Sequence, residues 1–472
     1  MPLIIGAKSA TATGYTVDNS CRFNDDDSSQ LQVTNGTATD NQKWTCSFWI
    51  KRGAVGGSHC LMAAKTGSPY FRLYIDSNNK INFYGNDKDD SNSVSYITNR
   101  LFRDPSAWYH IVTAMDSTLA AAGDRFRIYV NGVEETSFST ETDPTQNKIY
   151  PMTYTGFAVN VASRDDDVDP YDGYMAEVCL IDGQQLTPSS FGEFDEDSPT
   201  IWKPIAVSGL TFGNNGFYLD FQNSADLGAD VSGNSNDLTV TNLDATDQAT
   251  DTPTNNFCTL NPLDNNLVIS AATSTITLSQ GNCKFTGSGY PTVHSTQAVT
   301  KGKWYWEVKV PTSLGSIIGV SAGFPDETAF GAGVYDWGMY SDGNIWNSDS
   351  DSSYGNALSD DDILGIALDV DNSAMYVAIN NTWQDSGDPT SGASKTGAVA
   401  ITAVGSTLLG VYHFVVGDYS GAQTPIMEAN FGGCPAFAIS SGNADADGYG
   451  NFEYAPPSGF FALCTKNLAE YG

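Results

Sequence analysis

Apolar and polar residues alternate along many short stretches of this chain. In the stretch 125–130, Phe126, Ile128 and Val130 share one face, and an Asn-Gly pair typical of a tight hairpin turn follows. A period of two residues is that of a β-strand with one buried face, so the pattern predicts many short strands. The same alternation occurs in the stretches 71–75, 304–310 and 375–379.

Length and turn residues indicate two all-β domains with little helix. The chain has 472 residues, about three times the usual domain length, and 46 glycines and 19 prolines are scattered along it. The stretch 232–266 is rich in Asn, Asp, Thr and Ser and poor in apolar residues, which is typical of a connector. We therefore expect one domain over residues 1–205, a strand near 216–221 plus a polar connector within 206–266, and a second domain over 267–472.

The net charge of the chain limits the kinds of molecule that it can bind. With 22 basic and 55 acidic side chains the net charge is −33, which repels nucleic acid and anionic membrane surfaces. No stretch approaches the roughly 18 consecutive apolar residues that a membrane-spanning helix needs, and the amino terminus has no cleavage-type signal. We expect no nucleic-acid partner, no membrane insertion and synthesis without a signal peptide.

The cysteines show no metal-binding or redox spacing, and no Cys-x-x-Cys pair occurs. We expect mostly buried free thiols, with a disulfide framework as the alternative. The eight positions are Cys21, Cys46, Cys60, Cys179, Cys258, Cys283, Cys434 and Cys464.

Two sets of motifs resemble known families. The first set resembles a laminin-G-like, concanavalin A-type lectin domain, and the second resembles a SPRY domain. Both families are antiparallel sandwiches, so the resemblance implies an all-β protein of two concanavalin-like (jelly-roll) β-sandwich domains in tandem. The first set comprises residues 21–27, 44–51, 108–112, 128–132 and 171–178, and the second 302–308, 362–369 and 430–437.

The combination of these domains, with the stretches 182–192 and 457–460, resembles structural proteins of marine bacteriophages. The resemblance implies a virion surface protein of the tail fibre or adhesin type, made in the host cytoplasm. Its partners would be a host-surface polysaccharide or protein receptor, other virion proteins and further copies of itself in a homo-oligomer. The alternative is a capsid decoration or structural spacer that binds no receptor.

An acidic stretch at 164–173 is the candidate metal site. Asp165, Asp167, Asp169 and Asp172 could supply oxygen atoms to Ca²⁺, which takes about six to eight oxygen ligands. Laminin-G-like domains often hold calcium at such a rim and bind glycans beside it, so the resemblance implies that neighbouring Arg164 and Tyr171 contact a ligand. The alternative is a solvated Asp-rich turn.

A second candidate site is a set of aromatic residues interleaved with Gly, Asn and Asp. Exposed rings beside amides can stack on sugars or hold a peptide, whereas rings in the core only stabilise the fold. The residues predicted to bind a ligand are Trp337, Tyr340, Trp346, Tyr354 and Trp383, whereas Trp108, Trp304 and Trp306 lie at core positions of their strands.

Catalysis has little support in the sequence. Concanavalin-like glycoside hydrolases place two carboxylates on one strand, but the nearest acidic run, 193–197, reads as a solvated turn and lacks the second glutamate at the required spacing. The four histidines are isolated, and no motif indicates a nucleophile. We expect no enzyme activity, with a polysaccharide depolymerase as the third alternative.

Overall fold

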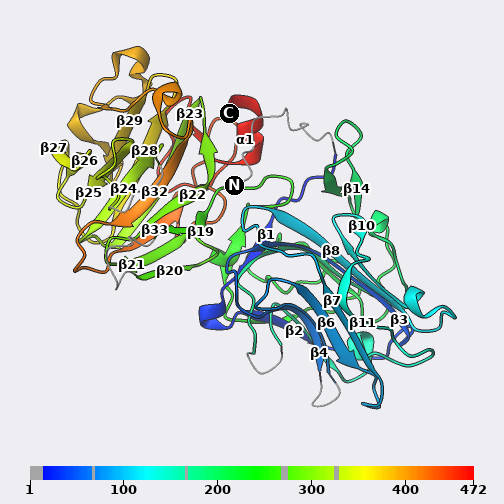
Figure 1. Ribbon diagram of the computed structural model, residues 1–472. Helices are drawn as coiled ribbons and strands as arrows, with labels where there is room; N and C mark the ends of the chain where they lie inside the picture. Colours follow the sequence, from blue (N-terminus) through cyan, green and yellow to red (C-terminus); the bar gives the residue numbers. More distant parts are fainter. Residues whose placement is uncertain (1–13, 66–69, 165–167, 267–274, 324–328) are drawn as a thin grey trace. The chain divides into compact units, whose positions relative to one another are not determined.

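The computed structural model describes residues 14–65, 70–164, 168–266, 275–323 and 329–472. In these residues the chain is almost entirely antiparallel β-structure, as predicted (Figure 1). It divides into two compact units, an N-terminal unit over Ala12–Thr254 and a C-terminal unit over Asn255–Gly472.

The N-terminal unit contains two eight-stranded sheets. Sheet A has the order β10-β9-β8-β3-β13-β1-β18, with β16 also paired to β13, and sheet B has the order β11-β7-β6-β5-β4-β12-β2-β17. A separate hairpin joins β14 to β15. The strands are β1 Ser20–Phe23, β2 Gln30–Thr34, β3 Lys43–Arg52, β4 His59–Lys65, β5 Tyr70–Ile75, β6 Ile81–Asn86, β7 Ser93–Thr98, β8 Trp108–Asp116, β9 Phe126–Val130, β10 Val133–Glu134, β11 Phe138–Thr142, β12 Ala158–Val161, β13 Gly173–Asp182, β14 Gly192–Phe194, β15 Trp202–Pro204, β16 Phe217–Leu219, β17 Thr239–Thr241 and β18 Gln248–Ala249. Short 3-10 turns lie at Asp25–Asp27, Ala122–Asp124, Pro151–Thr153, Pro188–Ser190 and Ala245–Asp247.

Alternation along the strands builds the core of this unit. On β5, Phe71, Leu73 and Ile75 are fully buried in the core, while the residues between them are only half-buried on the other face of sheet B. Trp44 of β3 packs edge-on against Phe71, with ring centroids 5.4 Å apart. The two sheets therefore form the predicted sandwich.

The C-terminal unit also contains two sheets. Sheet C has the order β19-β22-β32-β24-β25-β26-β27, and sheet D has the order β20-β21-β33-β23-β28-β29-β30, with β31 paired to β29 and β34 paired in parallel to β23. The elements are β19 Leu260–Asn266, β20 Thr275–Ser279, β21 Lys284–Ser288, β22 Thr292–Val299, β23 Lys303–Thr312, β24 Ser316–Ser321, β25 Asp336–Tyr340, β26 Asn344–Asn347, β27 Ser350–Ser353, β28 Asp362–Asp369, β29 Ala374–Ile379, β30 Thr382–Trp383, β31 Val399–Ala400, β32 Tyr412–Asp418, β33 Ile426–Asn430, β34 Phe461–Ala462 and helix α1 Thr465–Tyr471. Short 3-10 turns lie at Gln384–Ser386, Pro389–Ser394 and Val404–Ser406.

Strand β23 is buried on both faces. Trp304 and Trp306 lie in the core, as predicted. Tyr305 and Glu307, on the opposite face, are also buried, because aromatic side chains from the last 30 residues of the chain cover that side of sheet D. The carboxylate of Glu307 accepts hydrogen bonds from Tyr305 Oη, Asn430 Nδ2 and the backbone N–H groups of residues 453 and 454, at 2.8–3.1 Å.

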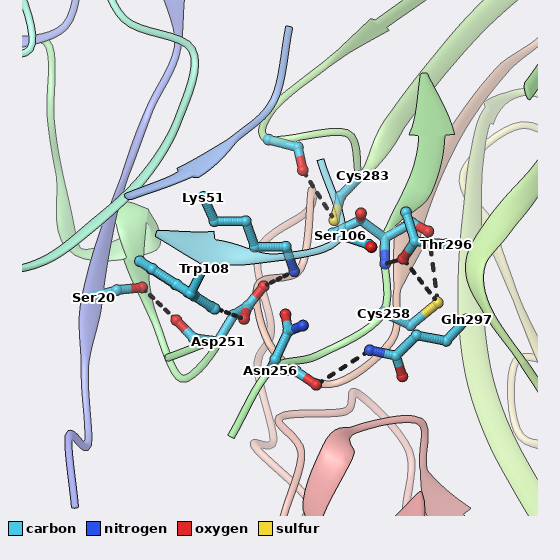
Figure 2. Close-up of polar contacts among 12 residues, drawn as sticks. Ser20, Lys51, Ser106, Trp108, Asp251, Asn256, Cys258, Cys283, Thr296 and Gln297 are labelled. Carbon is cyan, nitrogen blue, oxygen red and sulfur yellow. Dashed lines mark hydrogen bonds and ion pairs between the residues drawn. The ribbon is translucent and has the colours of Figure 1, made fainter. Parts of the chain in front are cut away.

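The prediction of a connector within 206–266 is wrong for most of that stretch, because residues up to Thr254 belong to the N-terminal unit. Strands β16, β17 and β18 pair with β13, β2 and β1 and complete both sheets of the N-terminal unit. Lys51 Nζ lies 2.6 Å from Asp251 Oδ2, Trp108 Nε1 donates to Asp251 Oδ1, and Ser20 Oγ donates to the Asp251 carbonyl (Figure 2). Strand β16 lies within the predicted strand near 216–221, whereas polar composition concealed β17 and β18, because their stability comes from pairing with distant strands rather than from their own apolar residues.

All eight cysteines are buried, as expected. In the C-terminal unit Cys258 Sγ lies 3.6 Å from Thr296 Oγ1 (Figure 2). Burial raises the pKa of the Cys464 thiol to about 12, so this thiol is not a reactive thiolate at neutral pH. Within the described residues no helix has the length and apolar character needed to cross a membrane.

Candidate functional site

Four partly exposed rings form a cluster on the outer face of sheet C, which we call the aromatic platform: Tyr290, Tyr340, Trp346 and Tyr419. The ring centroids of Trp346 and Tyr419 are 4.4 Å apart, and Tyr340 lies 5.7 Å from Tyr419 and 6.4 Å from Trp346. Tyr290 meets Tyr419 edge-on at 6.4 Å. Tyr340, Trp346 and Tyr419 pack against a small buried cluster of Ile317, Phe330 and Val415, which is separate from the main core of the unit.

Glycines make room for these rings. At Gly338, opposite Trp346 in the sheet, a Cβ atom would lie 2.6 Å from Ile317 and 2.7 Å from Phe330. At Gly331, where φ is +98°, a Cβ atom would lie 2.9 Å from Trp346. Larger residues at either position would displace the platform from the sheet.

Polar groups border the platform. Asp351 lies directly across the strand pair from Trp346, and its Oδ2 accepts a hydrogen bond from Asn344 Nδ2 at 2.8 Å. Tyr419 Oη donates to Asp349 Oδ1 at 3.3 Å, and burial together with that carboxylate raises the pKa of Tyr419 to about 12. Apolar ring faces beside carboxylates and amides can stack on a sugar ring and bind its hydroxyl groups.

The structure brings Tyr340 and Trp346 together but not the other predicted aromatic residues. Trp337 is buried on the inner face of sheet C against Tyr412, so it belongs to the core and cannot contact a surface ligand. Tyr354 is half-buried and donates to the carbonyl of Gly397. Trp383 packs against the aromatic cluster that covers sheet D.

The sequence did not indicate Tyr290 and Tyr419 as members of a binding site. Each lies in a loop, in Gly-Tyr-Pro and Asp-Tyr-Ser contexts that do not distinguish it from other surface tyrosines. Only the pairing of β22 with β32, and of β32 with β24, brings these loops beside Trp346. No local signal could have identified them.

The structure describes two of the four residues predicted to bind calcium, Asp169 and Asp172. Asp165 and Asp167 lie outside the described residues. The carboxylate of Asp169 lies 3.4 Å from Arg72 Nη1 and 4.0 Å from Arg164 Nη1, so two guanidinium groups already neutralise it. No group of three or more His, Cys, Asp or Glu side chains that could hold a metal ion occurs in the part of the chain that the structure describes.

Tyr171 is a core residue rather than a ligand contact. Its side chain is fully buried, its hydroxyl donates to the carbonyl of Lys51 at 2.9 Å, and its ring packs edge-on against Phe23.

Asp172 is buried without a full set of partners. It is 3% exposed, and its Oδ1 has no hydrogen-bond partner. The pKa of Asp172 is raised to about 8, mainly by burial and to a smaller extent by the nearby carboxylates of Asp25 and Asp26. A Cβ atom on Gly53 would lie 2.6 Å from this carboxylate, so the glycine is required for the close contact.

One Ser–His pair resembles part of a catalytic dyad. Ser47 Oγ lies 2.9 Å from His110 Nε2, and Trp202 Nε1 donates to His110 Nδ1 at 2.9 Å. Because Nδ1 accepts a hydrogen bond, the proton of the neutral ring is on Nε2, which donates to Ser47. Burial lowers the pKa of His110 to about 3, so this ring holds the β14–β15 hairpin in place rather than acting as a base for Ser47.

The acidic run at 193–197 includes strand β14 rather than forming only a turn. Lys203 Nζ lies 3.4 Å from Glu193 Oε1 and 3.2 Å from Asp195 Oδ2, and both oxygens of Asp195 are engaged, since Oδ1 accepts two backbone N–H groups. Lys203 is therefore an ion-pair partner of both carboxylates.

Comparisons with known proteins agree with the lectin-like fold. Residues 25–190 match the family model described as "Concanavalin A-like lectin/glucanases superfamily". The N-terminal unit therefore has a concanavalin A-like lectin fold, a class whose members bind carbohydrate or protein ligands. No curated protein matches the chain.

Solved structures with similar parts have low sequence identity. A heptameric SAP-like pentraxin from Limulus polyphemus is 14% identical, with 36% of this chain and 78% of that chain covered and a TM-score of 0.28. The SPRY domain of human HERC1 is 14% identical, with 38% and 99% covered and a TM-score of 0.26. A putative carbohydrate binding protein from Bacteroides ovatus is 16% identical, with 49% and 61% covered and a TM-score of 0.34.

Proposed function

We propose that this protein is a bacteriophage virion surface protein of the tail fibre type that binds a glycan or protein on the host cell. The observation that supports the proposal most strongly is the aromatic platform. Trp346, Tyr340 and Tyr419 stay partly exposed in a small cluster separate from the main core, and Asp349 and Asp351 lie beside them. Apolar patches with a polar rim are typical of binding sites.

The lectin-like fold of the N-terminal unit supports the same class of function. Single sugar sites bind weakly, so an adhesin needs several copies to attach firmly, and we propose a homo-oligomer mounted on other virion proteins. The net charge of −33 favours uncharged or cationic groups as the ligand of the platform, because Asp349 and Asp351 lie beside the rings.

We propose binding without catalysis. The two arrangements that most resemble catalytic groups, Ser47 with His110 and Glu193 with Asp195, are both engaged in other contacts. A depolymerase would release reducing ends from a host polysaccharide, and this release is the measurement that would contradict the proposal.

Calcium binding by the acidic stretch 164–173 is a separate proposal. Among the described residues of this stretch, Asp172 has a buried carboxylate oxygen, Oδ1, without a hydrogen-bond partner, and this oxygen supports the proposal. Thermal unfolding in millimolar calcium and in a chelator tests it. A calcium-dependent rise in melting temperature that Asp172→Asn removes would support the site, and identical melting curves would reject it.

The binding proposal is tested with fluorescently labelled protein on a panel of bacterial strains and their purified surface polysaccharides. We expect strain-selective binding that Trp346→Ala reduces at least tenfold. Leu408→Ala is the control, because Leu408 is an exposed apolar residue that is not part of the platform cluster. Absence of binding to every strain, or equal loss in both variants, would favour the structural spacer instead.

A further inference from the structure

A second aromatic surface lies on the outer face of sheet B in the N-terminal unit. Tyr70, Arg72 and Tyr74 alternate with the core residues of β5, and Tyr84 of β6 lies directly across the strand pair from Arg72. All four side chains are half-buried. We call this set the tyrosine–arginine face.

The rings hold the guanidinium group in place. Arg72 Cζ lies 4.3 Å from the ring centroid of Tyr74 and 5.8 Å from that of Tyr70, which is within the range of cation–π attraction. Tyr70 and Tyr84 contact each other with centroids 5.6 Å apart. Because the rings fix Arg72, a ligand that binds it loses little side-chain freedom on binding.

Two guanidinium groups share a single carboxylate at this face. Asp169 lies 3.4 Å from Arg72 and 4.0 Å from Arg164, and both distances exceed the 2.7–2.9 Å that is usual for a strong charge-assisted hydrogen bond. Asp169 is held in place by its backbone, whose carbonyl accepts from the N–H of Cys60 at 2.7 Å. Among the described residues, the Asp169 carboxylate is thus the ion-pair partner that Arg72 and Arg164 share.

We propose that the tyrosine–arginine face binds a sugar ring that carries a carboxylate or sulfate group. The tyrosine rings stack on the sugar, and Arg72 and Arg164 donate to the anionic oxygens, for which planar guanidinium groups are well suited. This site is in the other unit and has different chemistry from the aromatic platform, so it does not depend on the proposed function. A short anionic oligosaccharide is the expected ligand, because the acidic chain repels long polyanions.

Calorimetric titration of the full chain in about 0.15 M salt, where charges are screened beyond about 8 Å, tests the proposal. The probes are uronate oligosaccharides from alginate, sulfated dextran oligosaccharides and unmodified dextran oligosaccharides. We expect binding of at least one anionic probe and at least tenfold weaker binding of the neutral one. The two anionic probes distinguish a carboxylate from a sulfate as the preferred group.

Arg72→Gln is the test variant, and Arg127→Gln is its matched control. Arg127 lies in sheet A of the same unit, forms ion pairs with Glu134 and Asp124, and loses the same charge when substituted. We expect Arg72→Gln to weaken binding of the anionic probe at least tenfold and Arg127→Gln to change it less than twofold, with melting temperatures showing that both variants fold.

The experiment distinguishes binding at the tyrosine–arginine face from binding at the aromatic platform. Loss of anionic-probe binding in Arg72→Gln but not in Trp346→Ala supports the tyrosine–arginine face, whether or not the platform binds cells. No binding of either anionic probe, equal binding of the neutral probe, or equal loss in the Arg127 control overturns the proposal. If Arg72→Gln fails to fold, Tyr74→Leu replaces it, and unchanged binding in that variant overturns the proposal as well.

Discussion

Trp346 and Tyr419 lie with their ring centroids 4.4 Å apart, although 72 positions of chain separate β26 from the loop after β32. Neither residue is in the main core, and both rest on a sheet face lined with glycine. The chain thus keeps two large aromatic side chains partly in water, which opposes the hydrophobic effect unless a ligand covers them.

Because the platform lies outside the main core, substitution of one of its rings should have a small effect on stability. Trp346→Ala removes a partly exposed ring and is expected to lower the free energy of unfolding of the C-terminal unit by about 1–2 kcal/mol. Trp306→Ala removes a fully buried ring and is expected to cost about 3–5 kcal/mol. Chemical denaturation followed by circular dichroism measures both, and a larger loss for Trp346→Ala would show that the platform is part of the core.

Buried carboxyl groups predict a decline in stability as pH rises. Burial raises the pKa of Glu177 to about 7 and that of Asp172 to about 8. Between its ordinary pKa and these values each group is ionised in the unfolded chain but protonated in the folded one, so the free energy of unfolding falls as pH increases, by up to about 1.4 kcal/mol per pH unit for each group. Calorimetric melting temperatures should be higher at pH 5 than at pH 8.

Glu177 allows a control for this pH dependence. Its Oε2 accepts hydrogen bonds from Tyr15 and Tyr218, which an amide oxygen can also accept. Glu177→Gln should therefore flatten the fall in melting temperature of the N-terminal unit between pH 5 and pH 8. An unchanged slope in this variant would contradict the assignment of Glu177 as a titrating group.

Glu307 should not tolerate the same substitution. Both of its carboxylate oxygens accept two hydrogen bonds, so an amide would place its NH₂ group against two donors. We expect Glu307→Gln to cost about 2–4 kcal/mol and to speed amide hydrogen exchange at residues 453 and 454. Glu428→Gln, which breaks only the ion pair with Lys284 at the sheet surface, should change stability by less than about 1 kcal/mol.

The extent of the N-terminal unit can be tested with fragments. A fragment of residues 12–254 keeps β16, β17, β18 and the ion pair of Lys51 with Asp251, and it should unfold cooperatively. A fragment of residues 12–205 leaves Lys51 buried without its carboxylate and should be less stable by at least about 3 kcal/mol. Equal melting temperatures for the two fragments would show that residues 206–254 are a connector and do not stabilise the N-terminal unit.

The sequence by itself determined the all-β class, the sandwich architecture and the inward faces of the strands. Period-two alternation reports which residues of a strand share a face, as in Phe71, Leu73 and Ile75, and it needs no knowledge of distant contacts. The same alternation located the core tryptophans of β23, whereas two members of the aromatic platform were predicted from aromatic residues interleaved with Gly, Asn and Asp.

Only the tertiary structure decided which faces are covered and which distant residues meet. Tyr171 and Trp337 turned inward, Asp169 met two arginines, and Glu307 was buried beneath the end of the chain. The polar strands β17 and β18 joined the sheets because strand pairing is a non-local interaction. A local pattern describes one strand, whereas a binding site or a buried charge depends on side chains that several strands bring together.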